Sequence, residues 1–422
     1  MAKLTKAIIA EADKLPRLMM CGIVERKLRA QGIELEGDEL AALVDRLLEN
    51  GDGTFTFGEG NEALRNIDLI FDEEDSKEIE RTIANFTEEI PAMVERVIET
   101  SGANLFSSLR EAWQVEGALQ QFDADGFRER LEDRWGEGLD LLRMLLTCAR
   151  EIGTETDKRH RRSRSRRYAN RRFVLTRLHL RACQVADEVI TLLENGFADG
   201  ALARWRTLHE IDVTATVIED GDEDLALRFI EHDVVEVKKH ADDYDEKQVP
   251  MGYAPVAPRE RKRIEKAYAD VIARYGSEFR SEYGWAAKHL NSKRPTFKDL
   301  QARANQSGMN TYYKLANFQV HAGARAMFFR LGSLGREMPI AGRSNAGLME
   351  PGQNTAYTLV RITGALVGRL RNLDSMVEMK SILHMRDAIP PAFHRAANRL
   401  RRDEARFQKE RREKSGGKPA KR

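Results

Sequence analysis

The chain has 422 residues, of which 41% are hydrophobic and 32% are charged, a composition typical of a globular protein with a highly charged surface. Its length allows two or three domains, at roughly 100–200 residues each. The formal net charge of +1 by itself argues against a nucleic-acid partner. However, residues 1–157 hold 18 basic and 35 acidic side chains (−17), whereas residues 158–422 hold 51 and 33 (+18). This asymmetry predicts an acidic module joined to a basic one that faces a polyanion or the acidic half itself.

Cysteine usage and hydropathy exclude several protein classes. Cys21, Cys148 and Cys183 are far apart and form no CxxC motif. Neither a disulfide framework nor a cysteine zinc site is therefore expected, and a cytoplasmic location is predicted. The N-terminal sequence lacks the apolar core of a signal peptide. No run approaches the roughly 18 apolar residues that cross a bilayer, so no membrane partner is predicted.

Residues 1–157 are predicted to form an acidic helical module, with helices over 40–48, 76–86 and 139–152. Residues 48–59 overlay the calcium-binding EF-hand loop, with Asp52, Gly53 and Glu59 at ligand and turn positions. Leu48 stands at the first position, where an oxygen ligand is needed. A tight turn into the alternating segment 54–57 explains the glycines equally well. No metal site and no cofactor is therefore predicted.

Composition changes abruptly at residue 158. Residues 158–172 contain nine basic side chains and no acidic one, and they are predicted to form a basic connector. Arginines neutralise phosphates and a tyrosine ring stacks on a base, so the segment is a candidate for contact with RNA or another polyanion. The alternatives are a solvated linker or a strip that docks onto the acidic half. The candidate nucleic-acid-binding residues are Arg161, Arg162, Arg164, Arg166, Arg167 and Tyr168.

Helical periodicity dominates residues 173–394, which are predicted to form one helical domain. Apolar residues at 3-4-3-4-3 spacing indicate a helix that ends near Gly196. The proline-bearing stretch 249–258 is predicted to be a connection. Strand signals are nearly absent, so the fold class is all-α, a multi-helix bundle with little or no β structure. The expected helices span about 175–192, 199–218, 223–247, 259–275, 297–306, 311–331 and, after a long loop, 359–377.

The helix expected over 199–218 carries charged residues among apolar ones. Arg206 and Glu210 are four residues apart and share a face with apolar neighbours, so each ion requires the other if the pair is partly buried. Arg precedes Glu, the reverse of the favoured surface orientation, which indicates tertiary partners. The same helix also holds Arg204 and His209.

The helix expected over 311–331 carries a polar stripe. Lys314, Asn317, His321 and Arg325 recur at helical spacing on an otherwise apolar helix. A lone histidine in a helical bundle is usually a core residue. Because an amide and two cations accompany His321, a catalytic role and a structural role in the core are about equally supported.

Three segments together, RTLHE, FIEHDVVEVKKHADDYDE and YYKLANFQVHAGA, resemble the bacterial family catalogued as domain of unknown function 5677. The resemblance covers about residues 173–331. It implies an α-helical domain, and it implies no activity because none is established for the family. The matching positions are Arg206, Glu210, Tyr313, Asn317 and His321.

The same domain is similar to the helical HEPN superfamily, whose members include RNA-cleaving toxins and antiphage effectors. Those nucleases use an Arg-x4–6-His motif, in which His acts on the ribose 2′-hydroxyl and Arg supports the developing phosphate charge. Arg204 and His209 fit this spacing, whereas Lys314 and His321 fit it only with lysine in place of arginine. Trp205 follows Arg204 where the superfamily usually has a polar residue. The resemblance implies a metal-independent endoribonuclease.

The last segment, residues 395–422, holds twelve basic and four acidic side chains and is predicted to be a disordered basic tail. Together with the connector it forms the predicted polyanion-binding part of the chain. A homo-oligomer is also left open.

Two functions from different classes remain. The first is an RNA-directed effector in bacterial stress or phage defence, an endoribonuclease with a histidine acid/base whose pKa lies near the operating pH. The second is a non-enzymatic protein-binding or regulatory module in which the polar pairs of the two helices form a buried network. A solvent-open cleft favours chemistry and a sealed cluster favours structure. The candidate catalytic residues are Arg204, Arg206, His209, Glu210, Asn317 and His321.

Overall fold

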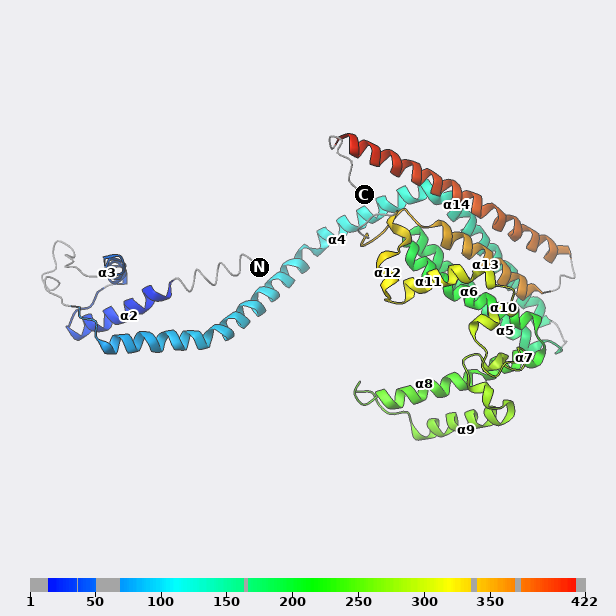
Figure 1. Cartoon of the computed structure of the whole chain (residues 1–422), viewed down its shortest axis with the longest axis horizontal. Coiled ribbons are helices and arrows are strands. Elements are labelled where there is room, and N and C mark those ends of the chain that lie inside the picture. The colour runs from blue at the N-terminus through cyan, green and yellow to red at the C-terminus, as the bar shows by residue number, and fades with distance from the viewer. Residues whose placement is uncertain are drawn as a thin grey trace. The chain divides into compact units, whose positions relative to one another are not determined.

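The computed structural model describes residues 14–35, 37–50, 69–162, 166–334, 340–368 and 373–414. Within these ranges every secondary-structure element is a helix, which confirms the all-α prediction. The chain divides into two compact units, Met1–Leu119 and Gln120–Arg422, whose helices are labelled in Figure 1. The calcium-loop positions Asp52, Gly53 and Glu59 and the alternating segment 54–57 lie outside the described residues.

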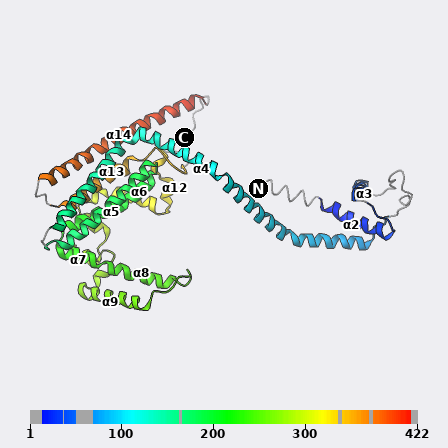
Figure 2. The ribbon, with the colours of Figure 1, turned by 180° about the vertical axis from the view of Figure 1, so that it is seen from behind.

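In its described residues the first unit contains α2 (Leu15–Ala30), α3 (Gly37–Asn50) and the beginning of α4 (Glu73–Arg162) (Figure 2). Apolar residues of α2 and α3, among them Leu28 and Val44, form a small core. The Asp72 carboxylate accepts hydrogen bonds from the first backbone amides of α4, as expected for a residue that caps a helix. Buried Asp75 pairs with Lys27 at 2.6 Å and Arg26 at 2.8 Å, which ties α4 to α2.

Helix α4 is continuous over 90 residues, where the sequence predicts separate helices over 76–86 and 139–152. Apolar residues of α4 between Leu131 and Ile152 lie in the main core of the second unit. The change in charge at residue 158 therefore falls inside that unit, and the division of the chain lies further upstream, after Leu119.

The core of the second unit is formed by α5 (Ala169–Glu194), α6 (Ala198–Asp220) and α13 (Met349–Val367), with the later part of α4 and with α14 (Leu373–Lys414). The buried ring of Phe393 on α14 lies against two glycines. A Cβ atom would approach this ring within 2.7 Å at Gly138 and 2.5 Å at Gly352. Glycine at both positions therefore allows α4 and α13 to approach α14 closely.

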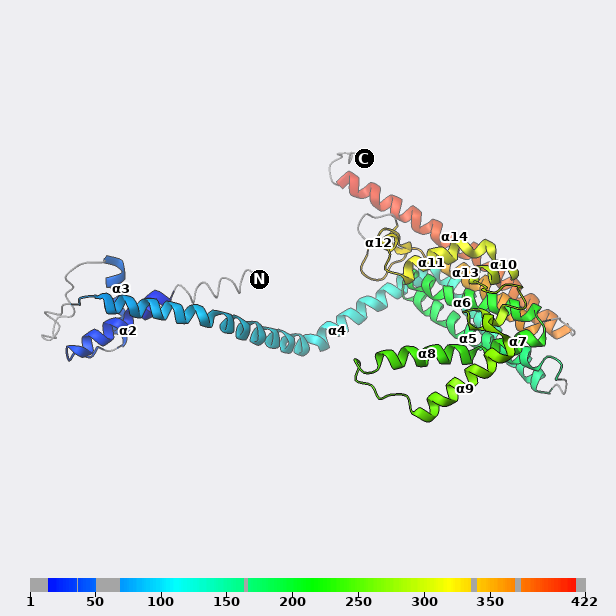
Figure 3. The same cartoon turned by 60° about the horizontal axis from the view of Figure 1, so that its bottom comes forward.

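Shorter helices connect these elements. After α6 come α7 (Glu223–Glu231), α8 (Asp233–Lys247) and α9 (Pro258–Tyr275), and the last two run side by side (Figure 3). The predicted proline-bearing connection lies between α8 and α9. The turns η2 (Ser277–Arg280) and η3 (Gly284–Ala286), helix α10 (Phe297–Arg303) and turn η4 (Ser307–Met309) lead to α11 (Asn310–Val320), α12 (Ala324–Phe328) and η5 (Leu331–Ser333). No helix in the described ranges has the length and apolar character needed to cross a membrane.

Three helices predicted as continuous are interrupted. The helix over 223–247 breaks at His232, whose Nε2 atom lies 2.9 Å from the carbonyl oxygen of Ser281. The helix over 311–331 ends at Val320, and Gly323 precedes α12 in extended conformation. The helix over 359–377 stops at Gly368, whose φ of +64° is costly for other residues.

The predicted disordered tail requires a correction, because residues 395–414 continue α14. Three apolar residues in this stretch, Ala396, Ala397 and Leu400, lie in the main core, and Arg134 of α4 pairs with Asp403 at 2.7 Å. The high net charge of residues 395–422 favoured a disordered tail, although the same segment contains these apolar residues. Residues 415–422 lie outside the described ranges.

Candidate functional site

The predicted pair on α6 exists and includes a third residue. Arg206 Nε donates to Glu210 Oε1 at 3.1 Å, and the hydroxyl of Tyr313 on α11 donates to the same oxygen at 2.8 Å. The Arg206 guanidinium also lies 5.0 Å from the centre of the Tyr313 ring, which adds a cation–π contact. These three residues, here called the Glu210 cluster, attach α11 to α6.

The electrostatics of the Glu210 cluster follow from partial burial and mutual contact. Burial, together with the Glu210 carboxylate, raises the pKa of Tyr313 to about 12. Burial also opposes the charge of Arg206, but its contacts with Tyr313 and Glu210 outweigh this effect, and the pKa of Arg206 is raised. Tyr313 and Arg206 therefore both keep the protons that they donate to the Glu210 carboxylate. The side chains of Arg206 and Glu210 remain 25% and 37% exposed.

His209 is sealed in the core. Its ring is fully buried, stacks on Trp205 with centroids 5.3 Å apart, and places Nε2 2.9 Å from Gln301 Nε2. With the amide nitrogen donating, this ring nitrogen carries no proton. Burial, aided by the charge of Arg361, lowers the pKa of His209 to about 4. The ring is therefore neutral near pH 7, inaccessible to a large substrate, and poorly suited to the predicted acid/base role.

A second acidic cluster, which the sequence analysis did not identify, surrounds Asp212 of α6. Its carboxylate is almost fully buried and accepts from Gln306 Nε2 at 2.6 Å and from Arg361 Nε at 3.1 Å. Thr216 completes the group through a 3.4 Å hydrogen bond. Burial raises the pKa of Asp212 to about 6, although Arg361 opposes the shift. This Asp212 cluster joins α6 to α13 and to Gln306, the residue that precedes turn η4.

The predicted network between Asn317 and His321 does not form. Asn317 lies on α11, and its Oδ1 atom is buried without a hydrogen-bond partner. His321 follows the last residue of α11 in extended conformation and is exposed. In the described part of the chain, no side-chain hydrogen bond or ion pair joins His321 to Glu210 or to Asn317. The helix ends before His321 and its side chain is not aligned with the preceding polar positions.

Arg204 faces a different helix from its predicted companions. Its Nε atom pairs with Glu188 of α5 and Nη1 lies 3.3 Å from the hydroxyl of Thr207. His209 is in the core, so the Arg-x4-His pair is split between a surface ion pair and a buried ring. The structure thus assembles two of the six predicted catalytic residues, Arg206 and Glu210, into one cluster with Tyr313.

The basic connector is largely folded. Helix α4 extends to Arg162 and α5 begins at Ala169. Some of its charges are paired locally, because Arg161 Nε lies 2.7 Å from Asp157 and Lys158 Nζ lies 2.7 Å from Glu155 on the same helix. The Tyr168 ring is exposed, with the Arg171 guanidinium 4.3 Å from its centre. Arg164 lies outside the described residues.

Four arginines near this turn lack such pairing. Arg162 and Arg166 of the connector and Arg177 and Arg181 of α5 are exposed. In the described part of the chain none of them forms an ion pair with a carboxylate, although Arg162, after Lys158, helps to lower the pKa of Glu155. Arg177 lies 4.3 Å from the centre of the exposed ring of Phe173. Phe173, Arg177 and Arg181 lie beyond the predicted connector, which ends at residue 172, but their spacing of four places them on one face of α5 and could have revealed them.

Comparison with known proteins gives one match, in the central part of the chain. Residues 172–338 match the family of unknown function DUF5677. No curated protein and no solved structure matches the chain. The match includes the Glu210 cluster and stops before α13, so Arg361 of the Asp212 cluster lies outside it. The resemblance to the HEPN superfamily stays a prediction.

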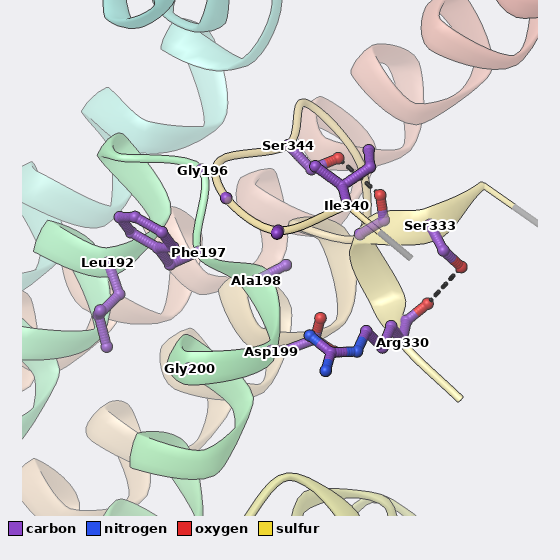
Figure 4. A pocket seen from close by; sticks show the side chains of 13 residues that line it. Leu192, Gly196, Phe197, Ala198, Asp199, Gly200, Arg330, Ser333, Ile340 and Ser344 are labelled. Atoms are coloured by element: carbon purple, nitrogen blue, oxygen red, sulfur yellow. Dashed lines mark hydrogen bonds between the residues drawn. The ribbon is translucent and has the colours of Figure 1, made fainter. Parts of the chain in front are cut away.

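One cavity of the second unit lies at the beginning of α6, within the DUF5677 region and the loop that follows it (Figure 4). Its volume is about 350 Å³, and Phe197, Asp199 and Arg330 line it. Asp199 Oδ1 accepts from the backbone amide of Leu331 at 2.8 Å, and Ser344 Oγ donates to a carbonyl oxygen at 2.7 Å. These polar groups hold the loop against α6. No predicted catalytic residue lines this cavity.

Clusters of metal-ligating side chains were sought among the described residues. Across the described ranges, no group of three or more His, Cys, Asp and Glu side chains is arranged to hold a metal ion. The buried pair His179 and Cys183 on α5 also forms no ligand set. The His179 ring lies 3.2 Å from the Thr363 hydroxyl, and burial lowers the pKa of His179 to about 4 and raises that of Cys183 to about 11.

Proposed function

We propose that the second unit is a non-enzymatic binding module that holds single-stranded RNA on the arginine surface of the α4–α5 turn. This RNA surface consists of Arg162, Arg166, Arg177 and Arg181 with the rings of Tyr168 and Phe173. The observation that carries the proposal is the set of four exposed arginines without carboxylate partners in the described residues. Such arginines are available to replace the counterions of a phosphate backbone.

The aromatic rings favour a single strand over a duplex. Tyr168 is 36% exposed and Phe173 is 46% exposed, and each has a guanidinium about 4.3 Å from its ring centre. Unpaired bases stack on such rings, and this contact is tolerant of sequence because every base has a π-face. Neither ring belongs to a base-reading element, so binding with little sequence preference is expected.

The polar clusters support a binding module over a nuclease. Glu210 accepts hydrogen bonds from two side chains, so its carboxylate is engaged in attaching α11. His209 is buried, with a pKa lowered to about 4 by burial. His321 is exposed, but the structure brings neither Arg204 nor Arg206 to it by a hydrogen bond or an aromatic contact in the described residues. The clusters therefore act in packing under this proposal.

The experiment measures binding of full-length protein to a fluorescent single-stranded RNA of 20 uridines as salt is varied. Removing the four arginines together, by changing each to alanine, should lower the salt dependence of log K by roughly 3, since each phosphate contact on a single strand contributes about 0.7. The control changes Arg259, Lys262, Arg263 and Lys266 of α9 to alanine. These cations are exposed, and the net charge falls by the same amount.

The control variant should bind RNA with nearly the salt dependence of the natural chain. Equal weakening by both variants would mean that net charge, not this surface, attracts RNA, and undiminished binding by the surface variant would exclude the proposed site. The same samples are analysed for RNA cleavage, and none is expected. Cleavage that disappears in His321→Ala would instead establish the nuclease hypothesis.

A further inference from the structure

Helix α4 carries a long apolar face within the first unit. Seven large apolar side chains between residues 98 and 119 are each 55–69% exposed. Trp113 is one of them, and it is the exposed member of the four tryptophans, since Trp135, Trp205 and Trp285 are buried. Six of the seven project within about 140° of one another around the helix, whereas Val115 projects to the side opposite Phe106. We call this face of six residues the α4 stripe; its members are Ile98, Leu105, Phe106, Leu109, Trp113 and Leu119.

The spacing of the stripe is that of a helix that packs on another helix. Ile98, Leu105, Ala112 and Leu119 follow one another at intervals of seven residues, and Leu109 lies one turn after Leu105. Repeats of seven keep one seam of a helix facing its partner. Trp113 also has a defined place, because a Cβ atom at Gly117 would lie 3.5 Å from its indole nitrogen. The ring thus lies along the helix surface, where a partner helix would cover it.

Charge is nearly absent from this segment. Among residues 100–121, Arg110, Glu111 and Glu116 are charged, which is three in 22, whereas 32% of the whole chain is charged. A solvated helix face normally has the opposite composition. The scarcity of charge also removes the like-charge repulsion that would oppose pairing of the segment with an identical copy.

The exposed area is sufficient for a stable association. At roughly 60% exposure, the six side chains of the stripe leave on the order of 100 Å² each. The total is roughly 600 Å² on one helix, so a pair of copies would bury on the order of 1,200 Å², the lower end of the range for a specific interface. A single apolar patch of this size on a monomer usually marks an interaction site.

We propose that the α4 stripe is a homodimer interface, and that its occupant is the α4 stripe of a second copy of this chain. A two-fold pairing places the same apolar face on both sides of the interface. This pairing covers Trp113 and the leucines with apolar side chains of the second copy. It also brings together two copies of a segment that has few charges. This inference is independent of the RNA proposal, because it concerns different residues and is tested without RNA.

The experiment uses full-length protein at concentrations from 0.1 to 100 µM, on the order of the range that brackets dimers of this size. Sedimentation gives the oligomeric state, and tryptophan emission reports the environment of Trp113. We expect a dimer at the upper concentrations, with emission that shifts to shorter wavelength as the dimer forms. The double substitution Leu105→Glu and Leu109→Glu should weaken association by at least about 100-fold, because it buries charge in the apolar contact.

Leu373→Glu is the matched control. Leu373 is also strongly exposed, at 74%, but it lies at the start of α14, and this variant should dimerise like the natural chain. Trp113→Phe should keep the dimer and lose the spectral shift. A monomer at every concentration would overturn the proposal, whether Trp113 is then exposed or covered by another part of the same chain. A dimer that persists in the double variant would overturn it as well, since another surface would be responsible.

Discussion

Glu210 and Asp212 lie two residues apart on α6, yet they occupy opposite kinds of environment. Glu210 is partly exposed and takes its hydrogen bonds from Arg206, one turn away, and from Tyr313 of α11. Asp212 is almost fully buried and is held by Arg361, 149 residues later in the chain. On a helix, two residues correspond to a rotation of roughly 200°. The two carboxylates therefore face different neighbours, and proximity in sequence says little about their roles.

The difference shows how the second unit is held together. The Glu210 cluster fastens one helix within the DUF5677 region, and water can still reach its carboxylate. The Asp212 cluster links that region to α13, which lies beyond the matched residues. Its carboxylate and the Gln306 amide are buried, although the Arg361 side chain is partly exposed. A buried charge that loses its partners has no replacement solvent. Loss of Asp212 should therefore cost more than loss of Glu210.

The largest expected effect is that of Asp212→Ala. The change leaves the Gln306 amide without its acceptor and removes the counter-charge of Arg361. Breaking a buried ion pair costs about 3–5 kcal/mol, and because the Arg361 side chain is 42% exposed, we expect about 3 kcal/mol of lost unfolding free energy. Urea denaturation monitored by circular dichroism measures this value.

Glu210→Ala is the matched control for this prediction, because it removes the same charge from the same helix. Partly exposed pairs contribute little, so a loss of about 1 kcal/mol is expected. Equal losses from the two variants would show that burial does not distinguish the clusters.

The second prediction concerns pH. Burial raises the pKa of Asp212 in the folded chain to about 6 from 3.8. Between these values the folded chain retains a proton that the unfolded chain has lost, so the contribution of Asp212 to stability is full below about pH 4 and is lost as pH rises through about 6. Asp212→Asn does not titrate. Its stability relative to the natural chain should therefore increase by roughly 2 kcal/mol between pH 4 and pH 7, since one pKa unit corresponds to about 1.4 kcal/mol.

Denaturation of both chains at several pH values tests this, because all other titrating groups are shared and cancel in the difference. A difference that stays constant from pH 4 to pH 7 would mean that Arg361 fully offsets the burial of the carboxylate. Asp212 and Glu210 would then differ in burial and in contacts, and the pKa of Asp212 would add nothing to that difference.

Sequence patterns predict contacts between residues that are close together in the sequence. The pairing of Arg206 with Glu210 follows from their separation of four residues, and helices α5 and α6 follow from apolar periodicity. The contact between Asp212 and Arg361 has no local signal, because two helices far apart in the chain must first pack. Net charge also misleads where a helix is mixed, as in residues 395–414, whose few apolar side chains lie in the core.

The predicted histidines illustrate the same limit. His209 shares its helix face with Trp205, and the aromatic stacking that buries it involves Phe297 and Tyr313 from other helices. His321 was expected to continue a polar stripe, but the stripe depends on an unbroken helix, and the chain leaves helical conformation after Val320. Glycine inside a helix costs about 1 kcal/mol, and Gly323 is the nearest signal in the sequence for that break.

The smallest expected effect separates attachment of α11 from stability of the whole unit. Tyr313→Phe removes the hydroxyl that donates to Glu210 at 2.8 Å and keeps the ring against Arg206. A partly exposed hydrogen bond contributes about 1 kcal/mol or less, because water replaces the lost donor at Glu210. Hydrogen exchange should accelerate in α11 and stay unchanged in α13. Tyr312→Phe is the control, since Tyr312 is exposed and, among the described residues, no hydrogen bond joins its hydroxyl to α6. Faster exchange in α13 as well would mean that the Glu210 and Asp212 clusters form one cooperative network. In that case the loss of the Tyr313 hydrogen bond would weaken the buried Asp212 cluster through α6.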